Sequence, residues 1–302
     1  MGRPIFEAVP NFSEGRDPAK ISRIVEAVRD VPGVRVLDLH SDADHNRSVI
    51  TMAGERAPLL EAAETLARAC ANEIDLSTQT GVHPRMGSLD VLPFVPLEGA
   101  TLEDAARLAR ETGQRISGLG FAVYLYESAA SAPHRRNLAD VRRGGYDGLV
   151  SRMSEPDWKP DYGPETLDPH LGAVAVGARP FLAAFNAYLD TDDVDVARAI
   201  AGKVRGRDGG LPGLKALGLS VRGQAQVSMN LTDLEKTSLP AALEAVHAEA
   251  AKFGASVEYT ELVGLMPLDA LVQTARYYLG LQDLERARVL EAGLWGGTDV
   301  LR

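Results

Sequence analysis

Residues 81–93 contain the side chains of this chain that are best suited to chemistry. His83 stands directly before Pro84, and Arg85 follows. Because the proline ring biases the preceding residue away from helical geometry, we expect His83 on a stiff, non-helical loop. The unperturbed pKa of histidine lies near neutrality, so His83 is a candidate general base. The alternative is a structural imidazole on a connection.

A second polar group lies where one expected strand ends and the next begins, and it comprises His40, Asp42, Asp44 and His45. Paired cysteines and two histidines at helical spacing are both missing from this group, so we expect no metal. An exposed polar turn or a substrate-facing loop accounts for it. His40, at the end of its strand, is a further catalytic candidate. Arg47 and Arg85 can pair with a carboxylate through two parallel hydrogen bonds, or can be surface charges.

The sequence carries no signature of a common cofactor. It has neither a phosphate-loop motif nor a dinucleotide-binding glycine fingerprint after its first strand. The single cysteine, Cys70, lies in a helical apolar pattern, and we expect it to be a small core residue.

Charge and hydropathy exclude two classes of partner. The net charge of −10 argues against non-specific binding to nucleic acid, which needs a basic footprint. Apolar runs such as residues 171–178 are too short to span a bilayer. We therefore expect a cytoplasmic protein.

Periodicity predicts an α/β (α+β) fold built from two similar halves, residues 1–178 and 179–302, each ordered β-α-β-β-α-β as in ferredoxin-like subdomains. Expected strands cover residues 5–10, 34–40, 48–53, 89–95, 121–126, 181–189, 214–220, 224–231 and 257–263. Expected helices cover residues 18–29, 57–74, 101–110, 194–204, 239–253 and 268–278. Thr101 is the expected N-cap of the third helix.

A connector, residues 146–172, joins the halves and is rich in proline, aspartate, glycine and aromatic residues. Connectors of this length inside a compact protein are more often functional than idle. Its aromatic side chains, Trp158 and Tyr162, either offer a flat surface to a ring-shaped ligand or pin the connector to the core.

Several blocks of sequence, in order, resemble the glutamate formimidoyltransferase family. They are residues 9–15 (VPNFSEG), 46–49 (NRSV), 83–91 (HPRMGSLDV), 123–126 (VYLY), 160–164 (PDYGP), 177–186 (GARPFLAAFN) and 226–231 (QVSMNL). The resemblance continues to residues 261–267, so it covers nearly the whole chain.

This resemblance implies transfer of the formimino group from N-formimino-L-glutamate to tetrahydrofolate, a co-substrate, in histidine degradation. The products are 5-formimidoyltetrahydrofolate and L-glutamate. It also implies two stacked subdomains with their helices outside, a folate tunnel between them, and a homodimer. In the family, the histidine that corresponds to His83 is the catalytic acid/base. Folate contacts fall on Gly163, Pro164, Glu165, Thr166, Leu167, Asp168, Pro169, His170, Leu171 and Gly172.

We further expect Arg85 and Arg47 to bind substrate carboxylates, and Asn11 and Asn230 to orient polar groups. Animal members carry an acidic residue at the position of His40. The partner that orients His83 is therefore expected to be Asp38, Asp42 or Asp44, or His40 itself. Animal members also fuse this unit to a cyclodeaminase, whereas the sequence ends at Arg302, so we expect the product to pass to a separate enzyme. Two alternatives stay open: an ATP-dependent cyclisation of 5-formyltetrahydrofolate on the same fold, and a non-catalytic folate-binding module.

Overall fold

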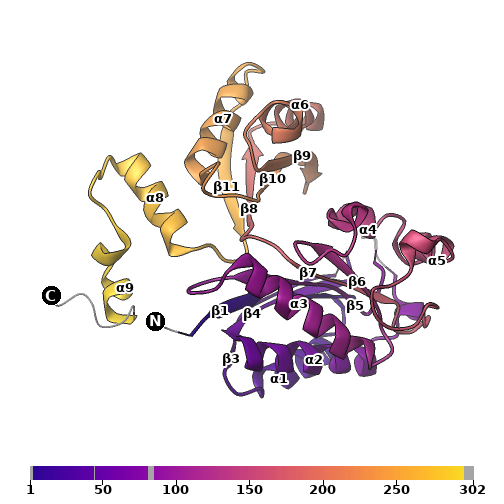
Figure 1. Ribbon diagram of the computed structural model, residues 1–302. Helices are drawn as coiled ribbons and strands as arrows, with labels where there is room; N and C mark the ends of the chain where they lie inside the picture. Colours follow the sequence, from indigo (N-terminus) through magenta and orange to yellow (C-terminus); the bar gives the residue numbers. More distant parts are fainter. Residues whose placement is uncertain (1–2, 44, 81–84, 296–302) are drawn as a thin grey trace. The chain divides into compact units, whose positions relative to one another are not determined.

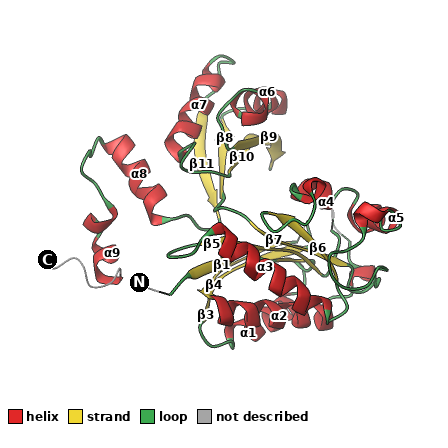
Figure 2. Cartoon of the chain, viewed as in Figure 1, coloured by secondary structure: helices red, strands yellow, loops and turns green. Residues whose placement is uncertain are grey.

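A computed structural model describes residues 3–43, 45–80 and 85–295 of the chain. Its internal contacts divide the chain into two units, Met1–Pro180 and Phe181–Arg302. Each unit contains one β-sheet with helices packed against it (Figures 1 and 2). None of the helices in the described part of the chain is both long enough and apolar enough to cross a membrane.

The sheet of the first unit contains seven strands. They are β1 (Ile5–Ala8), β2 (Asn11–Phe12), β3 (Val34–Asp42), β4 (Arg47–Glu55), β5 (Leu89–Pro96), β6 (Ala122–Glu127) and β7 (Ala173–Ala178). β1 and β2 both lie between β4 and β5 and are antiparallel to them, and β3 pairs with the outer edge of β4. On the other side of β5, β7 and then β6 continue the sheet in parallel.

One face of this sheet is covered by α1 (Pro18–Arg29), α2 (Arg56–Glu73) and α3 (Leu102–Ser117), as Figure 1 shows. The predicted boundaries of α1 are confirmed, and those of α2 are confirmed to within one residue. The prediction that α3 ends at residue 110 is wrong, because its buried face continues through Thr112 and Ile116. The main apolar core of the unit lies between these helices and the sheet.

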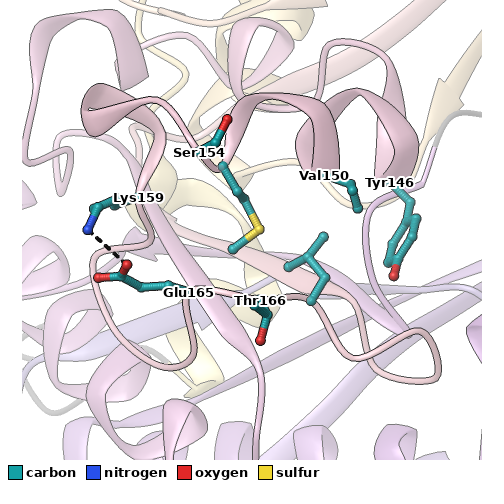
Figure 3. A pocket seen from close by; sticks show the side chains of 8 residues that line it. Tyr146, Val150, Ser154, Lys159, Glu165 and Thr166 are labelled. Atoms are coloured by element: carbon teal, nitrogen blue, oxygen red, sulfur yellow. Dashed lines mark hydrogen bonds and ion pairs between the residues drawn. The ribbon is translucent and has the colours of Figure 1, made fainter.

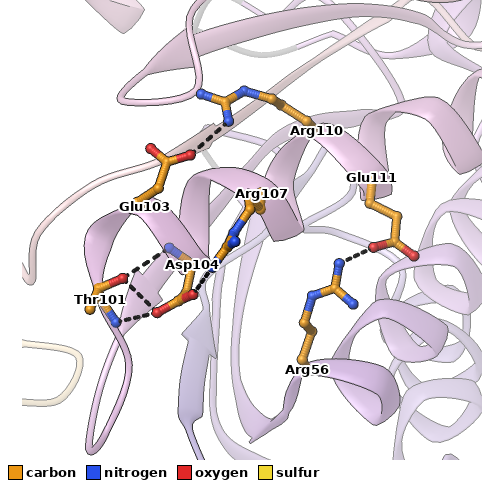
Figure 4. A network of polar contacts seen from close by, with 7 residues as sticks. All are labelled: Arg56, Thr101, Glu103, Asp104, Arg107, Arg110 and Glu111. Carbon is orange, nitrogen blue, oxygen red and sulfur yellow. Dashed lines mark hydrogen bonds and ion pairs between the residues drawn. The ribbon is translucent and has the colours of Figure 1, made fainter.

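The start of α3 is fixed by a reciprocal cap at Thr101 (Figure 4). The Thr101 hydroxyl accepts a hydrogen bond from the Asp104 N–H at 3.2 Å, and the Asp104 carboxylate accepts one from the Thr101 N–H at 3.0 Å. The N-cap prediction is therefore confirmed. In the same region Arg56 of α2 forms an ion pair with Glu111 of α3, which links the two helices.

The opposite face of the sheet is covered over β5, β7 and β6 by two short helices, α4 (Leu138–Val141) and α5 (Gly145–Arg152). Their apolar side chains pack against Tyr124 and Tyr126 of β6. Strand β7 was not predicted. All of its residues are buried, so it shows none of the alternation that identifies a half-exposed strand.

The second unit has a four-stranded sheet in the order β11-β8-β10-β9, formed by β8 (Ala183–Leu189), β9 (Leu214–Val221), β10 (Gln224–Leu231) and β11 (Val257–Val263). Its helices are α6 (Val194–Val204), α7 (Leu239–Ala251), α8 (Leu268–Leu279) and α9 (Leu290–Trp295). Short 3₁₀ turns in the chain are η1 (Leu76–Thr78), η2 (Pro133–Arg135), η3 (Pro156–Trp158), η4 (Gly206–Asp208) and η5 (Arg286–Arg288).

The strand order of the second unit repeats that of β5-β1-β4-β3 in the first. In both, the first and third strands of a β-α-β-β-α-β unit lie in the middle of the sheet. The predicted fold class is thus confirmed. The first unit differs by the two parallel strands, β7 and β6, that extend its sheet.

Candidate active site

The sheet of the first unit brings three of the predicted site residues onto one face. His40 of β3 lies opposite Val49 of β4, which in turn lies opposite Asn11 of β2. Arg47 is two residues from Val49, so its side chain leaves the strand on the same side. This is the face opposite the one that α1, α2 and α3 cover.

Asn11 has a polar atom that the fold leaves unsatisfied. The residue is 6% exposed, and its Nδ2 donates a hydrogen bond to the Val9 carbonyl at 2.8 Å. Its Oδ1 is buried and accepts no hydrogen bond from any residue that the structure describes. Since buried polar atoms are almost always paired, this oxygen is a good candidate to accept a hydrogen bond from a ligand.

The chain segment that begins at Arg85 is held from two sides. The Arg85 carbonyl accepts a hydrogen bond from the Tyr146 N–H at 2.9 Å, which joins it to the first turn of α5. The Met86 carbonyl accepts one from the Ala173 N–H at 2.8 Å, which joins it to the start of β7. Residues 85 and 86 therefore have a fixed backbone position relative to both ends of the connector.

Two glycines allow this contact. A β-carbon on Gly87 would lie 2.1 Å from the Ala173 carbonyl oxygen, and one on Gly172 would lie 2.2 Å from the Met86 carbonyl oxygen. Gly172 also has a φ of +71°, which side-chain-bearing residues rarely adopt. The close approach places the end of the predicted folate segment directly against the motif that contains Arg85.

A buried carboxylate, Asp90, lies at the centre of the positive charges of this region. It is 1% exposed, accepts a hydrogen bond from the Met86 N–H at 2.8 Å and forms an ion pair with Arg142. Burial raises the pKa of Asp90, and the charges of Arg142 and Arg47 act in the opposite direction. Arg85 also lies within the range of its charge.

Three arginines, Arg142, Arg47 and Arg85, lie within the range of the Asp90 charge. Burial lowers the pKa of Arg47 and of Arg85, although both guanidinium groups remain charged at neutral pH. The Nη1 atom of Arg85 is buried and makes no hydrogen bond to any residue within the described ranges. A desolvated guanidinium nitrogen with an open donor is well suited to a carboxylate.

Loops around the start of α1 complete this edge of the sheet. The Asn46 side chain accepts a hydrogen bond from the Gly15 N–H at 2.9 Å and donates one to the Thr80 carbonyl at 3.1 Å. The Ser13 hydroxyl donates to the Gly87 carbonyl at 2.7 Å. Three parts of the chain that are distant in sequence thus meet beside Arg47 and Arg85.

A cavity of about 540 Å³ lies between α5, at the start of the connector, and residues 159–167 farther along it (Figure 3). Its volume is within the size range of small-molecule sites. Tyr146, Val150 and Met153 line it from α5 and the residue after that helix, and the predicted folate residues Glu165, Thr166 and Leu167 line it from the later part of the connector. Lys159 forms an ion pair with Glu165 at 2.8 Å in the wall of the cavity.

The rest of the predicted folate segment forms a turn that is tied to η1. The Asp168 carboxylate accepts hydrogen bonds from the His170 N–H at 2.7 Å and the Leu171 N–H at 3.3 Å. The His170 imidazole contacts the Asp75 carboxylate at 2.7 Å, and this hydrogen bond and charge raise the pKa of His170. Most of the segment is exposed, so its side chains are accessible to a ligand.

The two connector aromatics contact the core of the first unit. Tyr162 packs against the main apolar core, and its carbonyl accepts a hydrogen bond from the Val123 N–H at 2.9 Å. Trp158 packs against the second apolar cluster, with the Arg152 guanidinium 4.0 Å from its ring centre. These contacts favour the interpretation that the two aromatic side chains anchor the connector to the core over the interpretation that they offer a flat surface to a ligand.

Of the remaining predicted residues, Asp38 and Asp42 lie on β3 with His40. Asn230 is exposed on β10 of the second unit. His83 and Asp44 lie outside the described residues. The described residues contain no group of three histidine, cysteine or acidic side chains arranged to hold a metal ion.

Sequence reasoning missed Asp90 and Arg142. Asp90 interrupts the apolar run of β5, and an acidic residue inside a buried strand is a usable signal of a paired or functional charge. Arg142 lies in an arginine-rich stretch that contains no comparable signal.

Comparisons with known proteins identify the family of the chain. Residues 5–179 match the family model of the formiminotransferase domain, N-terminal subdomain, and residues 184–291 match that of the formiminotransferase domain. The chain is 42% identical to glutamate formimidoyltransferase of Streptococcus pyogenes serotype M1, over 97% of this chain and 99% of that protein. It is also 42% identical to the protein of the same name from Thermoplasma acidophilum, over 95% and 96%. It is 39% identical to formimidoyltransferase-cyclodeaminase of Sus scrofa, over 95% of this chain and 56% of that protein.

Proposed function

Because the chain belongs to the formiminotransferase family, we propose that it transfers the formimino group of N-formimino-L-glutamate to tetrahydrofolate, in histidine degradation. The products are L-glutamate and 5-formimidoyltetrahydrofolate. The observation that carries this proposal is the full-length similarity to two proteins named glutamate formimidoyltransferase. The arginine cluster around Asp90 supports it, because the donor substrate is a dicarboxylate.

His83 is the proposed general acid/base. The N5 amine of tetrahydrofolate attacks the formimino carbon and loses a proton as the tetrahedral adduct forms. The carbon–nitrogen bond to glutamate then breaks, and the departing nitrogen gains a proton. One imidazole with a pKa near neutrality can carry that proton from the first nitrogen to the second, which contributes about 10²–10⁴ in rate. Holding the two substrates in contact contributes a further acceleration.

Arg85 and Arg47 are the proposed ligands of the donor's carboxylates. Both guanidinium groups lie within the range of the Asp90 charge, and Arg85 has a buried donor open to a ligand. Asn11, on the same sheet face as Arg47 and His40, is proposed to orient a polar group of a substrate through its Oδ1 atom.

Tetrahydrofolate is proposed to contact residues 163–172 and the cavity that this segment shares with α5. The cavity offers the apolar walls of Val150, Met153 and Leu167, and its volume suits part of a folate. The contact between Gly172 and the backbone at Met86 brings this segment next to the proposed donor site.

A homodimer in the cytoplasm completes the proposal, as the family resemblance implies. Sedimentation equilibrium of the purified chain tests the assembly state, and a mass of one chain at assay concentrations would contradict it. No metal is required for the steps described above.

The test is a turnover assay with formiminoglutamate and tetrahydrofolate, run beside a cyclisation assay with 5-formyltetrahydrofolate and ATP. We expect transfer in the first and no product in the second. Cyclisation without transfer, or folate binding with neither reaction, would contradict the proposal. The His83→Ala variant is expected to bind tetrahydrofolate and to lose about 10²–10⁴ in kcat. Unchanged turnover would exclude His83 as the acid/base.

A further inference from the structure

We propose that Asp90 is a positioning residue for the donor substrate and that it acts through Arg142 and the backbone at Met86. The inference rests on the proposed function and extends it to a buried residue that does not itself reach the substrate. The two oxygens of the Asp90 carboxylate have different tasks. Oδ1 accepts a hydrogen bond from the Met86 N–H at 2.8 Å, and Oδ2 accepts one from the Arg142 guanidinium.

The first task fixes the position of Arg85. Met86 follows Arg85 directly in the chain. The carbonyls of these two residues accept hydrogen bonds from the Tyr146 and Ala173 N–H groups. Asp90 therefore supplies the third attachment of this short stretch. Without it, the guanidinium of Arg85, with its open Nη1 donor, would no longer be held at one place.

The second task sets the charge balance. One carboxylate faces Arg142 directly and lies within the range of Arg47 and Arg85. Its charge therefore acts on all three guanidinium groups, and its ion pair orients that of Arg142. A substrate with two carboxylates meets guanidinium groups that are already desolvated and already oriented.

The chain offers a matched control for a buried carboxylate with a purely structural task. Asp161 forms an ion pair with Arg135 at 2.7 Å, with side chains 9% and 6% exposed. The same carboxylate accepts a hydrogen bond from the Leu125 N–H at 2.7 Å. Like Asp90, Asp161 is therefore a buried carboxylate that is bonded to an arginine and to the backbone, but its arginine is not part of the Asp90 cluster.

The experiment compares Asp90→Asn and Asp161→Asn in the full chain, with kinetic constants normalised to the folded fraction. Asparagine keeps an oxygen for the backbone N–H and removes the charge. If Asp90 positions the donor site, D90N raises the KM for formiminoglutamate by about tenfold or more, from the loss of an oriented charged hydrogen bond. The KM for tetrahydrofolate stays within about twofold. D161N is expected to lower the Tm and leave the KM for formiminoglutamate unchanged.

The direction of the change separates positioning from simple charge. If Asp90 only weakened the field of the arginines, its removal would strengthen their attraction for a carboxylate, and the KM would fall. A lower or unchanged KM in D90N, or an equal rise in D161N, overturns the inference.

A second variant and a wild-type control complete the experiment. If D90N does not fold, Arg142→Lys is measured instead, because it keeps the charge and removes the planar fork. A raised KM for formiminoglutamate supports the inference, and an unchanged one overturns it. The wild-type chain is measured in the same assay. An absence of transfer by the wild type would refute the proposed function itself. Transfer by the wild type together with an unchanged KM in D90N would refute only the role of Asp90.

Discussion

Replacing Arg85 by methionine should weaken binding of formiminoglutamate without weakening the fold. The guanidinium is partly buried, and its Nη1 atom forms no hydrogen bond to a described residue. A hydrogen bond between charged groups contributes about 1.5–3 kcal/mol. Because the nitrogen is already out of water in the free protein, little further desolvation opposes binding. We therefore expect the KM to rise by about tenfold to about a hundredfold.

The accompanying change in stability identifies the cause. A buried donor without a partner costs free energy, so methionine, which is apolar and of similar length, should leave the Tm unchanged or raise it. A carboxylate contact far from the reacting carbon is equally strong in the ground state and the transition state. The KM should therefore rise while kcat changes little.

The assay is steady-state transfer from formiminoglutamate at saturating tetrahydrofolate, with thermal unfolding of the same samples. Arg29→Met is the control, since Arg29 is an exposed residue of α1 that pairs with Glu26 on the same helix. An Arg85→Met variant with the wild-type KM would refute the assignment of Arg85 to a substrate carboxylate. A rise in KM that accompanies a loss of Tm would show that Arg85 serves the fold instead.

Three further outcomes follow from the structure. Thr101→Ala should lower the free energy of unfolding by about 1 kcal/mol in chemical denaturation, because it removes the N-cap of α3, and an unchanged value would contradict that role. The hydrogen bond and charge of Asp75 raise the pKa of His170 above its ordinary value of 6.5. The pair therefore stabilises the fold fully at pH values below about 6.5, and this stabilisation is lost as the pH rises through the pKa of the folded state. An NMR titration should show a lower pKa for His170 in Asp75→Asn, and equal values would exclude the pair in solution. Burial raises the pKa of the Cys70 thiol, so thiol reagents should label it only after unfolding, and rapid labelling of the native protein would contradict its position in the core.

Much of the fold could be predicted from local pattern. Helices such as α1 and α6 have an apolar face at helical spacing between recognisable ends, and their boundaries were predicted to the residue. The β-α-β-β-α-β order along each half was also predicted, because short apolar runs and their spacing identified the four principal strands of each half. Strand β7 could not be found in this way, since a strand buried on both faces has no alternation.

The candidate site was less accessible from sequence. Asn11, His40 and Arg47 could be named individually, but only the register of β2, β3 and β4 places them on one face. The Asp90–Arg142 pair joins residues that are 52 positions apart, and no local pattern predicts such a contact. The chemistry assigned to His83 came from the family resemblance, because a histidine before a proline is compatible with several roles.

The most direct test of the account follows the formimino group itself. Formiminoglutamate labelled with ¹³C at the formimino carbon and ¹⁵N at the imino nitrogen is incubated with tetrahydrofolate and the purified chain, and the products are separated by mass. Intact transfer predicts both labels together in 5-formimidoyltetrahydrofolate and unlabelled glutamate, at a rate that falls by about 10²–10⁴ in His83→Ala. If both labels stay in formiminoglutamate, or if the carbon leaves as free formate, the chain is not a formimidoyltransferase.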